Sequence, residues 1–282
     1  MMRHYVGRLS LAVVVLVPAL ANAQDRPAAP AVNVLTVYRE TVKPGKGSAH
    51  DAHEVGWAGA LAAAKYPTAM LAIKAMSGAP ENWYMSLYPS WAEYEKVSKA
   101  GDANPAFSAI DKQYSAMEGE YLNDARGMVL TSREDLSFGG PVDIATTRYF
   151  SVTRISVRPG QNAAFEENRK LIKAAHESAK LTDKYSMWQA ASGAPTGTYF
   201  MFVARKSLAE IDEGAAQHNS AAYTAALGGA DGQKKMAANT SAAVVSQQVD
   251  LFAVAPQQSI PVPDWVTADP GYWKHKPAAK KP

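Results

Sequence analysis

The sequence predicts an α+β protein made of two tandem copies of one β-α-β-β-α-β unit, whose antiparallel sheets pack face to face. Three observations lead to this prediction. The chain repeats itself at a constant spacing, both copies carry strand-rich and helix-rich segments in the same order, and 282 residues suffice for two domains of ordinary size.

The repeat is seen when the chain is shifted by 115 residues against itself. Pro-Gly at residues 44–45 and Ser-Gly-Ala-Pro at 77–80 then fall on the same letters at 159–160 and 192–195, with no gap between the two motifs. Farther along, Ala92-Glu93 matches Ala209-Glu210 at a spacing of 117, and we expect the spacing to return to 115 where Asp135-Leu136 meets Asp250-Leu251. Turn motifs paired at one spacing indicate an internal duplication.

Each copy opens with a β-rich run that stops at Pro-Gly, where proline lacks a donor and glycine permits a turn. A helix with an apolar face follows, and then two short strands joined by Ser-Gly-Ala-Pro. A second helical region and a last strand complete the copy. The predicted strands are 32–42, 69–76, 83–88 and 128–132 in the first copy and 149–157, 185–191, 198–204 and 243–252 in the second.

This order is that of a ferredoxin-like unit, a four-stranded antiparallel sheet with helices on one face. The other face must also be covered, and the second copy supplies a matching face, so we expect an α/β barrel within one chain. The predicted boundaries are a signal peptide (1–23), a linker (24–31), repeat 1 (32–138), a linker (139–147), repeat 2 (148–254) and a Pro-rich aromatic arm (255–282).

The leader has Arg3 and Arg8 before an apolar run from Leu9 to Leu20, followed by the small residues of a cleavage site at 21–23. We therefore expect a periplasmic or secreted protein with no membrane span, because the run is too short to cross a bilayer. The absence of cysteine excludes disulfides and thiolate sites. A formal charge of only +3, lowered further when the leader is removed, argues against a nucleic-acid partner.

The duplicated unit, the strand-Pro-Gly-helix opening and the hairpin after the first helix resemble the dimeric α/β-barrel superfamily over most of residues 32–252. That superfamily includes antibiotic-biosynthesis monooxygenases, haem-degrading monooxygenases, chlorite dismutases and dye-decolourising peroxidases. The resemblance implies cofactor-independent oxygenation or isomerisation as one class of activity. It implies haem binding as another, with an axial histidine on a helix of the C-terminal unit.

His176 and His218 are the candidate catalytic histidines of the second copy, since imidazole is the commonest acid or base near neutral pH. Under the haem alternative, either one would be the axial ligand. An exposed helical histidine is the plainer interpretation of both. His50 and His53 share a face of the first helix but supply only two ligands, so no metal site is predicted, and His53 is kept as a ligand-binding candidate.

Arg39 and Arg154 are the strongly polar pair that both copies keep on a strand, each at the end of an apolar stripe. A guanidinium there could bind an anionic group, or could form an ion pair that ties the strand to a neighbouring helix. Arg154 or Tyr185 is predicted to orient a substrate while a histidine moves a proton. The remaining ligand-binding candidates are aromatic side chains on elements between helices and sheet, which could equally be core: Trp57, Trp188 and Tyr199.

The arm after residue 254 is predicted to lie extended on the surface, held by Trp265, Tyr272 and Trp273, or to dock a partner. The predicted function is binding of a small apolar or aromatic molecule between sheet and helices, with no cofactor, as a monomer or homodimer. The chain would then be a monooxygenase- or isomerase-like enzyme. The alternatives are a haem-binding barrel and a non-catalytic assembly module of the cell envelope.

Overall fold

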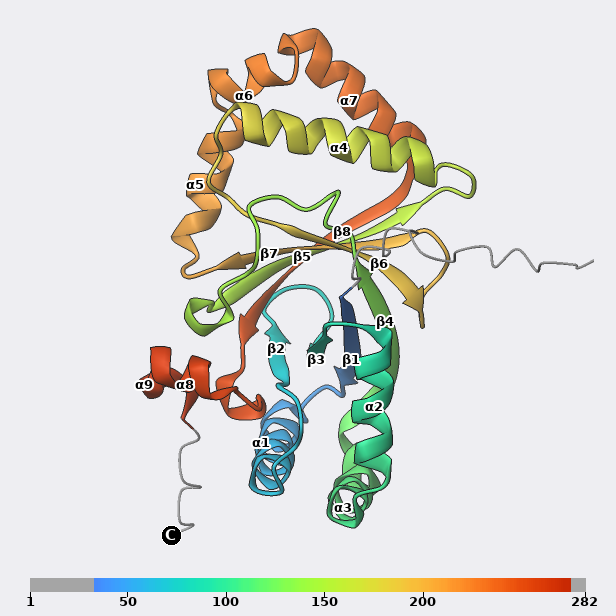
Figure 1. The fold of residues 1–282 in the computed structure, drawn as a ribbon, viewed down its shortest axis with the longest axis vertical. Helices are drawn as coiled ribbons and strands as arrows, with labels where there is room; N and C mark the ends of the chain where they lie inside the picture. The colour runs from blue at the N-terminus through green and yellow to red at the C-terminus, as the bar shows by residue number, and fades with distance from the viewer. Residues whose placement is uncertain (1–32, 275–282) are drawn as a thin grey trace, which may run out of the picture. The chain divides into compact units, whose positions relative to one another are not determined.

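The strands of residues 33–274, the part of the chain that this computed structural model describes, close into one antiparallel barrel (Figure 1). The first copy supplies β1 (Val34–Val42), β2 (Leu71–Ala75), β3 (Glu81–Tyr88) and β4 (Leu122–Ser132). The second supplies β5 (Tyr149–Val157), β6 (Ser186–Ser192), β7 (Thr198–Arg205) and β8 (Val244–Val254). The order around the barrel is β1-β3-β2-β8-β5-β7-β6-β4, which confirms the predicted fold class.

The two copies join at two seams, where strands of different copies pair edge to edge. At one seam, residues 129–132 of β4 pair with residues 188–192 of β6. At the other, residues 73–75 of β2 pair with residues 252–254 of β8. The faces that the helices leave bare therefore become the inside of a barrel.

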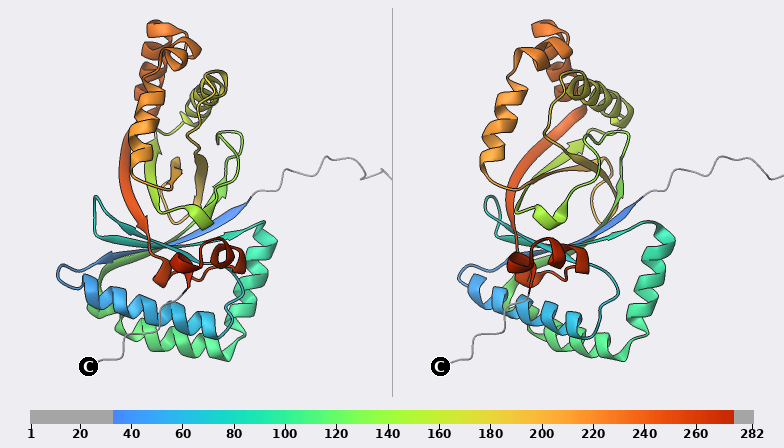
Figure 2. Two further views of the ribbon diagram at one scale, coloured as in Figure 1. Left: turned by 90° about the vertical axis from the view of Figure 1, so that its left-hand side faces the viewer. Right: turned by 60° about the vertical axis from the view of Figure 1, so that its left-hand side comes forward.

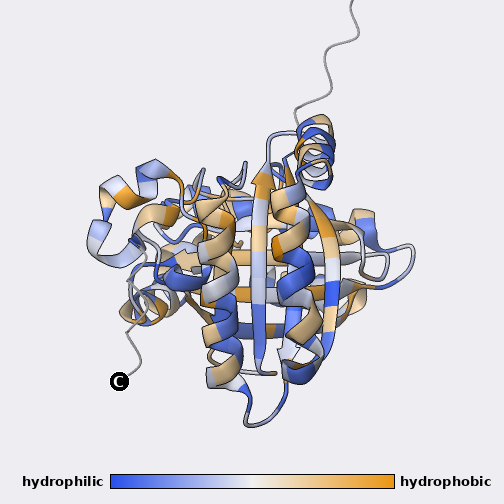
Figure 3. Ribbon diagram, turned by 90° about the horizontal axis from the view of Figure 1, so that it is seen from below, coloured by the Kyte–Doolittle hydropathy of each residue, from blue (hydrophilic) through white to orange (hydrophobic). Residues whose placement is uncertain are grey.

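The helices lie outside the barrel, on the sheet of their own copy (Figures 1 and 2). Figure 3 views the first copy from below, with its helices in front of the strands. The first copy has α1 (Gly47–Ala63), α2 (Trp91–Asp102) and α3 (Pro105–Tyr121), and the second has α4 (Asn162–Ser178), α5 (Ala209–His218), α6 (Ala221–Ala226) and α7 (Gly229–Ala243).

The duplication keeps its spacing up to the hairpin and then loses it. The first strands and first helices of the two copies are 115 residues apart, and β3 and β7 are 117 apart. However, β4 and β8 are 122 residues apart, because three helices in the second copy replace two in the first. The expected match of Asp135-Leu136 with Asp250-Leu251 is therefore wrong, since the first pair follows β4 whereas the second lies within β8.

Alternation along the strands separates an inner core from two outer ones. Side chains such as Val37, Trp83, Phe150 and Phe252 form the core inside the barrel. The alternate residues pack against the helices, in one cluster under α4 that includes Tyr199 and another under α1.

The C-terminal arm is helical, not extended as expected. It forms η2 (Pro256–Gln258), α8 (Pro263–Ala268) and α9 (Pro270–Trp273), each with a proline in its first turn, where the missing N–H is not needed. Trp273 is fully buried against the inner core, and its indole N–H donates to the Ala145 carbonyl at 2.8 Å. The Trp273 ring thus packs the arm on the barrel. An arm that docks a partner would need this ring to be exposed.

The predicted signal peptide (1–23), the linker 24–31 and the end of the arm (275–282) lie outside the described residues. None of the helices between residues 33 and 274 has the length and apolar character of a membrane-spanning segment.

Candidate functional site

Two of the predicted catalytic residues meet outside the sheet of the second copy. His176 lies in the last turn of α4, and His218 is the last residue of α5. Their Nε2 atoms are 3.1 Å apart. Asp183, in the segment between α4 and β6, places its Oδ2 atom 3.3 Å from Nε2 of His218. The fold therefore brings two imidazoles and a carboxylate to one point.

The hydrogen bond at the far side of the His176 ring defines its tautomer. Nδ1 lies 2.8 Å from the carbonyl oxygen of Ile172, and because a carbonyl can only accept, Nδ1 carries the hydrogen. Nε2 is then left with a free lone pair, directed at His218. Burial lowers the pKa of His176, since an imidazolium would lose its solvation, and this favours the neutral ring.

Aromatic rings surround the two histidines. The ring centroid of His176 lies 5.4 Å from that of Tyr185, 5.3 Å from Phe138 and 5.0 Å from Tyr223. Tyr185, another predicted site residue, is only 4% exposed, and its hydroxyl interacts with the Arg169 guanidinium. Burial raises the pKa of the Tyr185 hydroxyl, which therefore stays protonated at neutral pH.

This arrangement does not fit a haem. An axial histidine must direct Nε2 at an open slot, but Nε2 of each histidine is directed at the other, and Tyr223 packs on both rings. Neither histidine lines the large cavity of the barrel. Haem binding remains a prediction from the resemblance, without support from these contacts.

Arg154 lies away from the histidines, on the other face of the sheet. It follows Phe150 and Val152 along the inner face of β5, whereas His176 is on the helix side. Burial, together with the charge of Arg39, lowers the pKa of Arg154. Because the sheet separates them, Arg154 cannot orient a molecule held at His176.

Arg39 forms an ion pair within the barrel wall. Its Nη2 atom lies 2.6 Å from Glu81 Oε1 and its guanidinium 4.8 Å above the Trp83 ring, while the Trp83 indole donates to Glu81 at 2.7 Å. Both of its charged and aromatic partners are on the adjacent strand, β3. These contacts match the ion-pair interpretation, although the predicted partner was a helix.

His53 belongs to a second polar cluster, between α1 and the sheet of the first copy. Within that cluster His50 Nε2 lies 2.7 Å from Glu40 Oε2 and 3.8 Å from Glu54 Oε1, and all three residues are at least 96% buried. The His53 ring packs on Tyr114 and Tyr121. Nδ1 of His50 has no partner among residues 33–274, so its proton is on Nε2, shared with Glu40. This cluster is an internal hydrogen-bonded group.

Tyr199 and Trp57 occupy core positions. The Tyr199 hydroxyl donates to Glu166 at 2.6 Å and its ring packs on Phe165, whereas Trp57 packs edge-on against Tyr84. Neither residue lines the large cavity, so their ligand-binding roles remain predictions that no contact supports.

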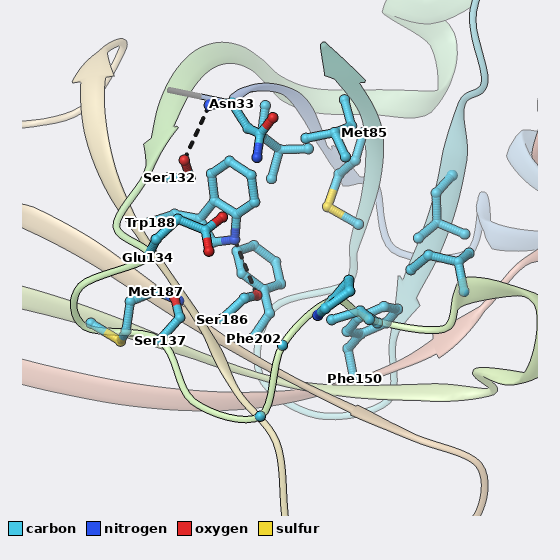
Figure 4. Close-up of a pocket in the computed structure, with 18 of the residues that line it drawn as sticks. Asn33, Met85, Ser132, Glu134, Ser137, Phe150, Ser186, Met187, Trp188 and Phe202 are labelled. Atoms are coloured by element: carbon cyan, nitrogen blue, oxygen red, sulfur yellow. Dashed lines mark hydrogen bonds between the residues drawn. The ribbon is translucent and has the colours of Figure 1, made fainter. Parts of the chain in front are cut away.

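The large cavity, of about 850 Å³, opens at one end of the barrel. Its wall includes Trp188 and inner-core side chains such as Leu35, Met85, Phe150 and Phe202 (Figure 4). The Trp188 indole donates to Ser186 Oγ at 3.1 Å, and Asn33 N–H donates to Ser132 Oγ at the rim. Trp265 of the arm and residues 139–142 of the linker complete the lining. The predicted space between sheet and helices is thus not where this cavity lies.

The cavity and the histidine cluster lie on opposite faces of the same segment. Ser186 and Trp188 line the cavity, whereas Tyr185, which precedes them, faces the histidines. Sequence reasoning missed Asp183 and Tyr223. A signal was present, because a shift of 115 residues places His176, Asp183 and Tyr185 on Leu61, Thr68 and Met70, so three chemically different replacements occur within ten residues.

No family model matches the chain, and no curated protein does. Among solved structures, it is similar to a proposed monooxygenase from Fusobacterium nucleatum, with a TM-score of 0.52, 12% identity and coverage of 80% of this chain and 94% of that one. A proposed monooxygenase from Lactobacillus acidophilus matches with a TM-score of 0.50 and 7% identity, over 79% of this chain and 94% of that one. An anthrone oxidase-like protein matches with a TM-score of 0.52 and 14% identity, over 81% of this chain and 92% of that one. At such identities the likeness shows the fold alone. The chain has the dimeric α/β-barrel fold.

Proposed function

We propose that the protein binds a small apolar or aromatic molecule in the open end of the barrel. The observation that carries this proposal is the cavity of about 850 Å³, whose wall is built from inner-core side chains. Pockets that hold small molecules have volumes of about 300–1,000 Å³ and mostly apolar walls with a few polar groups. Water in such a space has few partners, and an apolar molecule would release it.

Trp188 is the side chain proposed to hold the ligand. Its ring is part of the cavity wall (Figure 4), and its indole N–H is already bonded to Ser186, so its face is left for stacking. Asn33, Ser132 and Ser137 at the rim supply the polar groups that would orient the molecule.

Binding, not a reaction, is proposed for this cavity. Oxygenation or isomerisation without a cofactor needs a base that reaches the bound molecule. The acid–base groups of the described lining are Glu134, Lys173 and Glu177, and both carboxylates are solvent-exposed, so neither is held in the apolar part of the wall. His176 and His218 are on the other face of the wall.

The test uses the fluorescent probe 1-anilinonaphthalene-8-sulfonate, together with native mass spectrometry of the protein as purified. Ala69→Phe should fill part of the cavity and Trp188→Ala should remove the stacking face, so each should weaken probe binding about tenfold or more. Leu171→Ala is the control, because Leu171 is exposed on α4 outside the lining. Equal probe binding by all four proteins, with no copurifying molecule, would refute the proposal.

We also propose that the protein is exported and cleaved after Ala23, on the sequence of the leader alone. The intact mass of the protein recovered from the periplasm should correspond to a chain that starts at Gln24. Recovery of the uncleaved chain from the cytoplasm would contradict it.

A further inference from the structure

Outside the proposed binding cavity, two clusters of the described residues have the composition of a metal site: Glu40, His50 and Glu54 in the first copy, and His176, Asp183 and His218 in the second. The second cluster is the one whose contacts suit an ion. His176, Asp183 and His218 each offer one ligand atom, and these atoms all lie within 4.8 Å of one another. The residues come from α4, from the segment before β6 and from α5, so their convergence is produced by the tertiary fold and not by the spacing of one helix.

The distances suit a shared ion. Two nitrogen ligands bound at about 2.0–2.1 Å to one metal lie about 2.8–3.0 Å apart in octahedral geometry and about 3.3–3.4 Å apart in tetrahedral geometry. The Nε2 atoms of His176 and His218 are 3.1 Å apart, and the Asp183 oxygen is 3.3 Å from the second. An ion could therefore be accommodated with little movement of the rings.

The His176 ring is held as a metal ligand usually is. Metal-ligating histidines nearly always donate their second N–H to a carbonyl or carboxylate, which fixes the tautomer and aims the lone pair. Nδ1 of His176 donates to the Ile172 carbonyl at 2.8 Å. In the buried cluster of the first copy, by contrast, Nδ1 of His50 has no partner within the described chain and Nε2 is hydrogen-bonded to Glu40.

A buried polar atom of the cluster also lacks a partner. The second carboxylate oxygen of Asp183 makes no hydrogen bond within residues 33–274. Burying such an atom unpaired is costly, and water bound to a metal would supply a partner. The Tyr185 hydroxyl, in contrast, interacts with the Arg169 guanidinium.

We propose that His176, Asp183 and His218 bind one divalent first-row transition-metal ion. Two imidazoles and a carboxylate form a donor set that suits such ions better than it suits calcium or magnesium, which prefer oxygen ligands. Three protein ligands leave at least one position open, as in sites that bind water or a substrate. This inference is independent of the proposed cavity function, because the two sites share no ligand residue.

The opposing interpretation is a hydrogen-bonded relay, in which His218 donates Nε2–H to His176 or to Asp183. Arg169 distinguishes a cation site from a relay. Its guanidinium carbon lies 5.3 Å from the Tyr185 ring centroid, and that ring lies 5.4 Å from the His176 ring, so the positive charge stands close to the cluster. The same charge must repel a bound metal, so removing it should strengthen metal binding.

The test is titration of the full-length protein, freed of metal by chelator, with Zn²⁺ in a calorimeter and with Co²⁺ by visible absorption. We expect one ion per chain. His218→Ala and Asp183→Asn should each weaken binding by about 100-fold or more, because loss of a ligand costs at least as much as loss of its supporting hydrogen bond. His218 has a 41% exposed side chain, so its replacement should leave the fold intact.

Arg169→Gln should bind the same ions several-fold more tightly, a gain that damage to the fold cannot mimic. His275→Ala, which removes a histidine outside the described residues, is the control and should bind normally. Absence of binding, or binding unchanged in His218→Ala and Asp183→Asn, would overturn the proposal. Loss of binding in His50→Gln, with normal binding in His218→Ala, would do so as well, because it would place the metal in the first copy.

Discussion

Gly193 packs directly on the backbone of Gly127, at the seam where β6 meets β4. A β-carbon at residue 193 would overlap the Gly127 carbonyl oxygen and lie 2.6 Å from the Cα of Met128. Gly78, at the matching turn of the first copy, likewise faces Asp250 across the other seam. The repeated Ser-Gly-Ala-Pro motif therefore marks where each copy touches the other, and at Gly193 the contact is with backbone, which leaves no room for a β-carbon.

Gly193→Ala should destabilise the protein by more than its backbone angle explains. The φ of Gly193 is +77°, and an alanine there costs roughly 1–2 kcal/mol, to which overpacking adds about 1–3 kcal/mol. Gly160→Ala is the matched control, with φ +78° and no atom within 4 Å of the new β-carbon. Urea denaturation of both variants measures the difference, and equal losses would show that the seam tolerates a methyl group.

Trp273→Ala should lower the free energy of unfolding by about 3–5 kcal/mol, because loss of a fully buried ring leaves a cavity and removes one of the two hydrogen bonds that the Ala145 carbonyl accepts. Trp91→Ala, at a residue that is 46% exposed, should cost far less. Thermal unfolding of the two variants compares them. Similar small losses would mean that the arm contributes little to the barrel.

Lys180→Gly should stabilise the protein. Lys180 and Lys65 end α4 and α1 with φ of 55° and 60°, a region in which a β-carbon is strained and glycine is not. We expect a gain of about 0.5–1 kcal/mol in the free energy of unfolding. The same change at Lys170, inside α4, should instead cost about 1 kcal/mol. A lower free energy of unfolding for Lys180→Gly would show that contacts of the Lys180 side chain stabilise the protein by more than the backbone strain costs.

Glu54 should make the protein less stable as the pH rises. Burial, reinforced by the charge of Glu40, raises the pKa of Glu54 to about 8, so the folded state holds a proton that the unfolded state releases at its ordinary pKa near 4.5. The contribution of this proton to the free energy of unfolding is complete at pH values below the pKa of Glu54 in the unfolded state. It is lost as the pH rises through the pKa of Glu54 in the folded state. The other groups that face Glu54 are His50, His53, Tyr84, Glu118 and Asp51.

Glu54→Gln keeps the shape and removes the titration, so its stability should fall less between pH 5 and about 8 than that of the natural chain. Urea denaturation at several pH values checks this. Identical slopes for the two proteins would show that Glu54 titrates normally in the folded state.

Much of the fold could be predicted because it is encoded locally and twice. Pro44-Gly45 and its copy end the first strands where expected, and the spacing of 115 residues held through both first helices. The last strand of the second copy was predicted within two residues of its observed bounds, whereas β4 begins at Leu122, six residues before the predicted start at 128. The spacing could not correct that start, because the extra helix of the second copy changes it. The helical form of the arm depends on burial of Trp273, which is a tertiary contact.

The candidate sites were harder to predict, because each combines residues that only the tertiary structure brings together. His176, His218 and Tyr185 were selected on chemistry and lie together, whereas Asp183 has no helical or strand spacing that links it to them. Arg154 and Arg39 were placed correctly at the ends of apolar stripes. The sequence pattern did not show that the arginines lie on the inner face of the sheet, whereas the histidines lie on the helix side.

The ring of eight strands has a consequence for how this protein can change over time. Each copy alone would have two edge strands, whose backbone N–H and C=O groups are unpaired and available to pair with another chain. An ancestor with a single copy would have needed a second molecule to complete its circle. Joining both copies in one chain makes that association permanent, and it leaves the second half free to carry His176 and Asp183 where the first half has Leu61 and Thr68.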